Sequence, residues 1–362
     1  MERVFNFSAG PSTMPIEVLE RAQKELVNYG EAGMSVMEMS HRSKDYQEII
    51  DRAEGTLREV MNIPDDYKVL FLQGGGSTQF AMIPMNFMHK SKKACYINTG
   101  AWTKKSIKEA KLFGDVKVVG TSEDKNFAYI PKTTRADFDQ DADYAYICQN
   151  NTIFGTRYTK DSLPDVGNVP LISDLSSNIL SEEVNVSDYA MIFAGAQKNV
   201  GMAGVTICII KDSFLENTND DITTMLKYST HVAKGSMFNT PPTYAIYIAG
   251  LMFEWVKNQG GVKELERRNN EKADLLYGFI DASDMYTGTV ATEDRSLMNV
   301  TFVTGDADLD AKFIAEAKEQ GMVNLKGHRS VGGIRASIYN AMPLEGVQKL
   351  VNFMKEFEKN NR

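Results

Sequence analysis

The chain contains 362 residues, of which 43% are apolar and 24% are charged, and its formal net charge at pH 7 is −8. This composition is typical of folded globular proteins and excludes a disordered, collagenous or coiled-coil chain. The length corresponds to about two domains. The acidic balance argues against a general binder of nucleic acids or anionic membranes, which needs a basic surface. No apolar run is long enough to span a bilayer, so no membrane partner is expected.

The three cysteines are too few for a disulfide framework. Cys95, Cys148 and Cys208 each lie in an apolar, strand-like run, which indicates buried and inert thiols. No apolar leader follows the charged start of the chain, and we expect a reducing, cytoplasmic setting. The four histidines are scattered and neither CxxC nor HExxH occurs, so no metal site is expected.

Two amphipathic helices are predicted near the beginning of the chain. Residues 15–29 begin with Pro15, repeat apolar residues on one face and reach Gly30, and residues 45–61 repeat the same spacing before Pro64. Short apolar runs then alternate with helix-length polar stretches, which indicates strands buried on both faces of a mostly parallel sheet. These runs cover residues 68–72, 94–98, 116–120, 144–148, 170–174, 189–195 and 205–211.

The pattern changes after a helix that begins near Pro241 and ends at Gly260. A long polar helix at about 262–281 leads into runs that follow a β-α-β-β-α order, which is typical of a small α+β domain. The sequence therefore predicts an α/β layer fold with active groups at strand ends, followed by a smaller α+β part, with the boundary near residue 260.

The first candidate site follows the apolar run 68–72, where Gln73 is followed by Gly74, Gly75, Gly76 and Ser77. Glycines let the backbone approach an anion, and the N-terminus of a following helix offers unpaired N–H groups. A phosphate site is plausible on this pattern, although it is neither a Walker loop nor a GxGxxG fingerprint. A tight strand-to-helix turn without a ligand explains an isolated glycine triplet equally well.

A second pair of candidates consists of Asp174 and Lys198, which both follow apolar strand-like runs. A carboxylate there can hold a protonated ring nitrogen, and a desolvated lysine has a lowered pKa that makes it an imine-forming nucleophile. Taken singly, each is more simply a strand-end residue that reaches solvent. Together with the glycine-rich anchor, they match the phosphate cup, carboxylate and Schiff-base lysine that pyridoxal phosphate needs.

Trp102 and Thr152 also follow predicted strands. Trp102 could stack on a flat cofactor, although tryptophan more often fills a core. Thr152 could bond a cofactor oxygen, and a turn-capping role is an equal alternative.

The third candidate feature is a set of histidine and arginine residues. His41 precedes Arg42, His328 precedes Arg329, and Arg335 lies inside an apolar run. Arginine binds carboxylates and phosphates bidentately, whereas isolated His-Arg pairs are usually surface features. Two such pairs and a further arginine in an acidic chain favour a doubly anionic small-molecule ligand.

Blocks along nearly the whole chain resemble those of the phosphoserine aminotransferases, which belong to the class V group of fold-type I pyridoxal phosphate enzymes. The blocks are FNFSAGPSTMP, GMSVMEMSHRS, QGGGSTQFAMIPMN, NTGAWTKKSIKEAK, AGAQKNVG, FNTPPTYAIY and GHRSVGGIRASIYNAM. The resemblance implies a homodimer in which residues 16–260 form a large cofactor domain. Residues 1–15 and 261–362 would form the small domain.

The resemblance also assigns roles to residues of this chain. Lys198 would be the Schiff-base lysine, Asp174 would pair with the pyridine nitrogen, Trp102 would stack on the ring and Thr152 would bond the ring hydroxyl. The cofactor phosphate would be held by Gly76, Ser77 and Gln197 of one subunit and by Asn239 and Thr240 of the other. Arg335 would take the substrate α-carboxylate, and Ser8 and Ala9 would border the substrate. The distal phosphate or carboxylate would be held by His41, Arg42, His328 and Arg329, the first two across the dimer.

Position 77 is Ser, where some family members carry Arg, so this chain lacks that side-chain charge. The implied reaction is ping-pong transfer of the amino group from L-glutamate to 3-phosphohydroxypyruvate, which gives 2-oxoglutarate and O-phospho-L-serine in serine biosynthesis. The phosphorylated ketoacid of pyridoxine biosynthesis is a further acceptor that the resemblance allows.

Three alternatives stay open at this point. A class V lyase or desulfurase needs a reactive cysteine on a mobile loop, and the three cysteines here lie in predicted strands. A phosphate- or nucleotide-binding protein without chemistry would rest on the glycine triplet and leave Lys198 without a role. An interaction scaffold would leave Asp174, Lys198 and the arginines unexplained.

Overall fold

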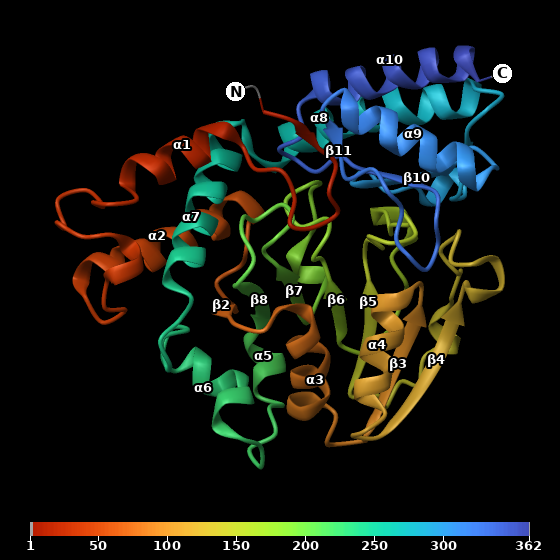
Figure 1. The fold of residues 1–362 in the computed structure, drawn as a ribbon. Coiled ribbons are helices and arrows are strands. Elements are labelled where there is room, and N and C mark those ends of the chain that lie inside the picture. The colour runs from red at the N-terminus through yellow and green to blue at the C-terminus, as the bar shows by residue number, and fades with distance from the viewer. Residues whose placement is uncertain (1–2, 362) are drawn as a thin grey trace.

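The computed structural model describes residues 3–361, and its centre is a seven-stranded sheet with the strand order β2-β8-β7-β6-β5-β3-β4 (Figure 1). Its strands are β2 (Tyr67–Leu72), β3 (Lys93–Asn98), β4 (Asp115–Thr121), β5 (Tyr144–Cys148), β6 (Leu171–Asp174), β7 (Met191–Gly195) and β8 (Thr206–Lys211). Each of the seven predicted apolar runs therefore forms a strand of this one sheet.

The strands from β4 to β7 are parallel to one another, whereas β8 is antiparallel to both β7 and β2. The predicted α/β fold with a mostly parallel sheet is confirmed. The reversed direction of β8 was not predicted, because an apolar run shows that a strand is buried but not which way it runs.

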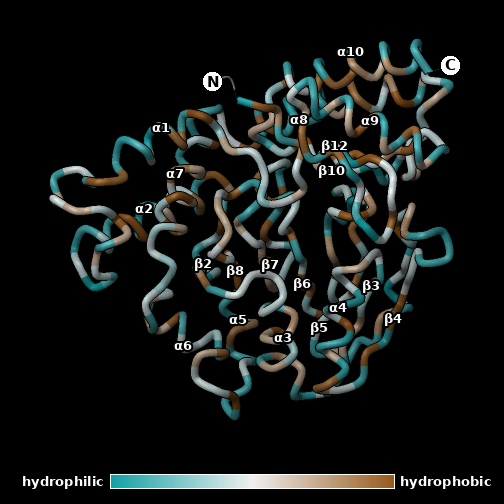
Figure 2. The backbone as a smooth tube through the Cα atoms, in the orientation of Figure 1, coloured by the Kyte–Doolittle hydropathy of each residue, from teal (hydrophilic) through white to brown (hydrophobic). Residues whose placement is uncertain are grey.

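Alternate residues of each central strand enter two different cores, because successive side chains point to opposite faces of a sheet. Phe71 and Ile147 pack on the face covered by helices α2 (Lys44–Met61) and α7 (Thr243–Asn258). Leu72 and Tyr146 pack on the face covered by helices α3 (Gly75–Phe87) and α4 (Ala101–Ala110). Burial on both faces explains why these strands read as continuous apolar runs, which lie in the middle of the molecule (Figure 2).

The helices of this part of the chain are α1 (Ile16–Glu25), α2 (Lys44–Met61), α3 (Gly75–Phe87), α4 (Ala101–Ala110), α5 (Asp212–Leu215), α6 (Tyr228–Val232) and α7 (Thr243–Asn258). The predicted helix over 15–29 is wrong in its last residues, since α1 ends at Glu25. The backbone turns instead, because Tyr29 N–H donates to the carbonyl of Met34 and Ala32 N–H donates to that of Tyr29. Val27 is accordingly exposed rather than packed.

The C-terminal third forms a separate layer at the top of Figure 1. It contains α8 (Gly261–Ala282), β9 (Thr287–Gly288), β10 (Asn299–Val303), α9 (Ala307–Glu319), β11 (Met322–Val323), β12 (Ile334–Ser337) and α10 (Leu344–Asn360). Antiparallel pairing gives a three-stranded sheet of order β12-β10-β9, and its apolar residues form a core with α8, α9 and α10.

The N-terminal segment reaches this C-terminal layer. Strand β1 (Phe5–Asn6) pairs in parallel with β11, and Phe7 is buried in the C-terminal core. Strand β11 has only two residues, and its partner comes from the other end of the chain. The next residues of the N-terminal segment run back toward the central sheet, which brings them to the site described below.

None of the helices in the described part of the chain combines the length and apolar character needed to cross a lipid bilayer. All three cysteines are free and buried in β3, β5 and β8, as predicted.

Candidate active site

A cavity of about 190 Å³ lies at the carboxyl ends of β5, β6 and β7. Parallel strands end at the same edge of a sheet, so their last residues and the loops that follow them meet there. The lining residues are Gly74, Gly75, Gly76, Ser77, Phe80, Trp102, Cys148, Asn150, Thr152, Asp174, Ser176, Ser177, Gly195, Gln197 and Lys198.

Lys198 follows β7 and is only 9% exposed. Its Nζ donates a hydrogen bond of 2.7 Å to Thr152 Oγ1, in the loop after β5. Burial lowers the pKa of Lys198 to about 8, the negative charge of Asp174 acts in the opposite direction, and Arg335 lowers it further. A substantial fraction of this amine is therefore neutral and nucleophilic near neutral pH.

Asp174 is the last residue of β6 and is 5% exposed. Its Oδ1 accepts a 2.8 Å hydrogen bond from the backbone N–H of Ser176, and no salt bridge to it occurs among residues 3–361. Burial raises the pKa of this carboxyl, while Ser176 and Lys198 favour its ionised form. A buried carboxylate without a paired cation is suited to a cationic group of a ligand.

The glycine-rich loop forms the start of α3, so the N–H groups of its first turn are free for an anion. Gly74 has φ +94°, and a Cβ there would lie 1.9 Å from Thr78 Oγ1. Thr78 Oγ1 in turn donates to the carbonyl of Gly74 at 3.0 Å. Glycine is therefore required at position 74 by both backbone conformation and space.

The N-terminal segment lies directly against Lys198. Ser12 Oγ donates a 2.5 Å hydrogen bond to the Lys198 carbonyl, and a Cβ on Gly10 would lie 3.7 Å from Lys198 Cε. Ala9 accepts a 2.7 Å bond through its carbonyl from Tyr339 Oη, and Ser8 Oγ accepts from Gly10 N–H. Residues 8–12 thus join the Lys198 loop to the C-terminal layer.

Arg335 lies on β12 and reaches the cavity wall, where its Nη1 donates a 3.0 Å bond to the Thr152 carbonyl. His328 and Arg329 lie in the loop between β11 and β12. Burial and the charges of Arg335, Arg329 and Lys105 lower the pKa of His328. Arg335 and Arg329 thus form a cationic group next to the cavity, with the His328 ring beside them.

Nine of the sequence-predicted residues do not line the cavity of this chain, and four of these nine also lie outside the N-terminal segment and the arginine group described above. His41 is buried at 7% exposure before α2, with Nε2 lacking a partner among the described residues, and Arg42 beside it is exposed. Asn239 and Thr240 lie before α7, where the Thr240 carbonyl accepts a bond from Gln73.

Comparison with known proteins identifies the family. The family model described as Aminotransferase class-V matches residues 4–350. The chain is 55% identical to the phosphoserine aminotransferase of Bacillus cereus and 50% identical to that of Bacillus subtilis, each over the full length of both chains. The chain belongs to the phosphoserine aminotransferases, within aminotransferase class V.

Solved structures of phosphoserine aminotransferases have the same fold as this chain. The enzyme from Bacillus circulans subsp. alkalophilus is 43% identical, covers all of both chains and superimposes with a TM-score of 0.96. The pyridoxal phosphate-bound enzyme from Trichomonas vaginalis is 39% identical, with a TM-score of 0.92 over 98% of this chain and all of that one. Pyridoxal phosphate is the cofactor of this aminotransferase, as the sequence predicted.

Several residues that line this aminotransferase site were not predicted from the sequence. Asn150 lines the cavity, and its Nδ2 donates to Ser177 Oγ at 2.8 Å and to Asn299 Oδ1 at 2.9 Å. Ser176 Oγ accepts a 3.1 Å bond from Gly195 N–H. Only their positions in the sequence could have indicated these two residues, since Asn150 follows β5 and Ser176 follows β6 closely. Polar residues after a strand are too common for position alone to identify a site residue.

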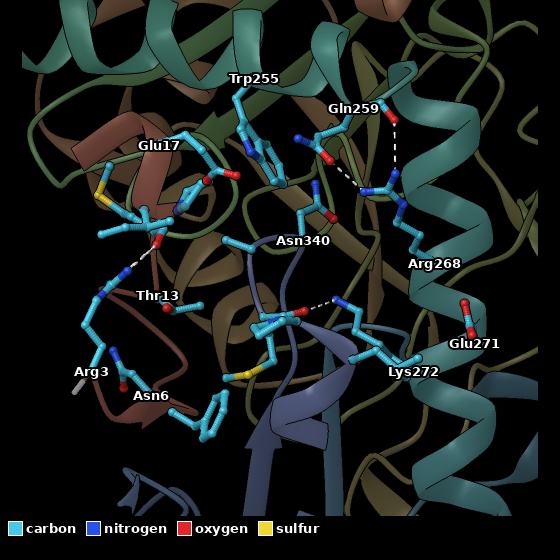
Figure 3. Close-up of a pocket in the computed structure, with 18 of the residues that line it drawn as sticks. Arg3, Asn6, Thr13, Glu17, Trp255, Gln259, Arg268, Glu271, Lys272 and Asn340 are labelled. Carbon is cyan, nitrogen blue, oxygen red and sulfur yellow. Dashed lines mark hydrogen bonds between the residues drawn. The ribbon is translucent and has the colours of Figure 1, made fainter. Parts of the chain in front are cut away.

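A second cavity of about 550 Å³ lies away from this site, between the N-terminal segment, the end of α7 and one face of α8 (Figure 3). Its cations already have partners. Lys272 donates three hydrogen bonds of 2.8–3.0 Å to backbone carbonyls after β12, and Arg268 Nη1 donates a 2.6 Å bond to Gln259 Oε1. None of the sequence-predicted aminotransferase residues lines it, so we assign it no role in the reaction.

The lowered pKa of Lys198 predicts an unusual pH dependence for its reaction with aldehydes. In the cofactor-free chain, the trapping of pyridoxal by cyanoborohydride at Lys198 should rise about tenfold per pH unit below pH 8 and level off above it. Mass spectrometry of the digested chain measures this rate against that of surface lysines. A midpoint near the ordinary lysine value of 10.5 would contradict the predicted desolvation of this amine.

Proposed function

We propose that the chain transfers the amino group of L-glutamate to 3-phosphohydroxypyruvate and releases 2-oxoglutarate and O-phospho-L-serine in ping-pong order. One observation carries the proposal: a single cavity brings the desolvated amine of Lys198 together with the buried carboxylate of Asp174 and the start of α3. The chain is also at least 50% identical, over its full length, to phosphoserine aminotransferases.

The cavity fits pyridoxal phosphate by its donors and charges. The unpaired carboxylate of Asp174 suits a protonated ring nitrogen, and the free N–H groups of Gly76 and Ser77 suit a phosphate. Trp102 offers a ring face, and Thr152 Oγ1 offers a hydrogen bond to a ring substituent. When bound, the cofactor supplies an electron sink for the bonds at the substrate Cα.

The residues of the chain perform the binding and the proton transfer. Arg335 would hold the substrate α-carboxylate in a bidentate pair beside Thr152, which places the substrate Cα near Lys198 Nζ. Lys198 Nζ would take the proton from the substrate Cα and later give it back to complete the transfer. A pKa near 8 suits both steps, because the amine can accept and donate a proton near neutral pH. The Arg329 guanidinium, with the His328 ring as a hydrogen-bond donor, would hold the distal anion of either substrate.

We also propose a homodimer, because His41, Arg42, Asn239 and Thr240 lie outside the cavity of their own chain. In the dimer, Asn239 and Thr240 would complete the phosphate cup of the other subunit, and His41 and Arg42 would complete its distal anion site.

Two further assignments belong to this proposal. Residues 16–260 would act as the cofactor domain, and residues 1–15 and 261–362 as the small domain, which is supported by the separate apolar core around α8, α9 and α10. The cytoplasm is proposed as the setting, and three free, buried cysteines are consistent with a reducing compartment. Their burial, which raises the pKa of Cys148 and Cys208, also disfavours a desulfurase reaction.

Half-reactions test the proposed function. The holoenzyme given L-glutamate alone should release one 2-oxoglutarate per active site and then stop, because the amino group stays on the enzyme. Addition of 3-phosphohydroxypyruvate should restart turnover and give O-phosphoserine. The phosphorylated ketoacid of pyridoxine biosynthesis, tested in parallel, measures the second acceptor. Equal turnover with pyruvate, which has no distal anion, would contradict the proposed substrate class.

A further inference from the structure

Lys105 lies on α4, one helical turn after the cavity-lining Trp102. Its Nζ lies over the ring of Trp102, 4.4 Å from the ring centroid. This contact holds the ammonium group near the rim of the active-site cavity, because residues three apart on a helix lie on the same face.

The loop that carries His328 and Arg329 reaches the same place. Val331 of this loop packs with Trp102 against an apolar cluster that contains Phe154. The charge of Lys105 acts on His328 together with the charges of Arg335 and Arg329. Lys105 therefore extends the cationic group beside the cavity from the α4 side.

The charge of Lys105 is also available to a ligand. No salt bridge involving Lys105 occurs within the part of the chain that the structure describes, whereas the adjacent Lys104 pairs with Glu123. The positive charge of an unpaired lysine repels neighbouring cations in the free protein, and a bound anion offsets this repulsion. Ser77 contributes no charge to the site, so the distal anion of the substrate depends on the remaining cations.

We propose that Lys105 is a further substrate-binding residue, which contacts the distal phosphate of the phosphorylated substrate from the rim formed by α4. This proposal rests on the proposed function. A phosphate monoester carries nearly two negative charges at pH 7, whereas the side-chain carboxylate of glutamate carries one. Lys105 therefore favours the phosphorylated substrate over the dicarboxylate and takes part in distinguishing the two.

Two unreactive ligands separate these contributions on the holoenzyme. 3-Phosphoglycerate has the carboxylate and phosphate of the substrate, and 2-hydroxyglutarate has the two carboxylates of glutamate, but neither has an amino or keto group. In calorimetric titration, Lys105→Met should weaken binding of 3-phosphoglycerate about tenfold and of 2-hydroxyglutarate less than about threefold. Methionine keeps an apolar stem against Trp102.

Steady-state kinetics should show the same selectivity. In Lys105→Met, the KM for 3-phosphohydroxypyruvate should rise about tenfold with kcat nearly unchanged, because Lys105 lies away from the reacting carbon. Lys105→Arg should retain binding within about threefold, since it keeps the charge. Lys108→Met provides the matched control, because Lys108 is an exposed lysine one turn further along α4.

Two results would overturn the assignment. If Lys105→Met and Lys108→Met bind 3-phosphoglycerate equally well, Lys105 does not contact the phosphate. If Lys105→Met weakens both ligands equally and lowers kcat, its role is to support Trp102. Failure of the wild-type enzyme to bind 3-phosphoglycerate and to use 3-phosphohydroxypyruvate would instead contradict the proposed function itself.

Discussion

Replacement of Lys198 by alanine should lower turnover at least about a thousandfold, because it removes both the nucleophilic amine and the group that moves the Cα proton. The loss should appear in the reaction with L-glutamate alone as well as in full turnover. The midpoint temperature of thermal unfolding should change little. The substitution loses the hydrogen bond from Lys198 to Thr152, but it also removes the cost of burying a cation.

Rescue by a small amine distinguishes loss of the proton carrier from loss of the site. Methylamine added to Lys198→Ala should restore part of the rate, with a dependence on the free-base concentration, and should not accelerate the wild-type enzyme. Retention of more than about a tenth of wild-type turnover by Lys198→Ala would contradict the assigned role.

The central part of this site is predictable from the sequence because the strands of the sheet have a simple local pattern. Apolar runs that end in a charged or glycine-rich segment are sufficient to identify Asp174, Lys198 and the loop at Gly74 as candidates. Parallel strands then bring such ends to one edge, so residues distant in sequence meet in the cavity.

The parts that the sequence could not predict depend on long-range pairing. The bond from Arg335 to the Thr152 carbonyl joins residues 183 apart, and the pairing of β1 with β11 joins opposite ends of the chain. Local periodicity contains no information about such partners. Asn150 was missed for a related reason, since its bonds to Ser177 and Asn299 become visible only when three segments are assembled.

Replacement of Asp174 by asparagine should lower turnover about a hundredfold or more, although asparagine has nearly the same shape. The substitution removes the negative charge that would stabilise a protonated ring nitrogen in a buried site, where an ion pair has a large effect. Asp174→Glu should recover part of the loss, because it restores the charge at a displaced position. The exposed Asp161, replaced by asparagine, is a matched control that should keep full activity.

A second readout of Asp174→Asn does not depend on turnover. The negative charge of Asp174 raises the pKa of Lys198 in the wild-type chain, against the larger effect of burial. Without this charge, the protonated amine is less stable, so the pKa of Lys198 should fall further below about 8. Pyridoxal trapping at Lys198 in the cofactor-free chain should then level off at a lower pH than in the wild type. An unchanged midpoint, together with full turnover, would show that the two buried groups are not electrostatically coupled across the cavity.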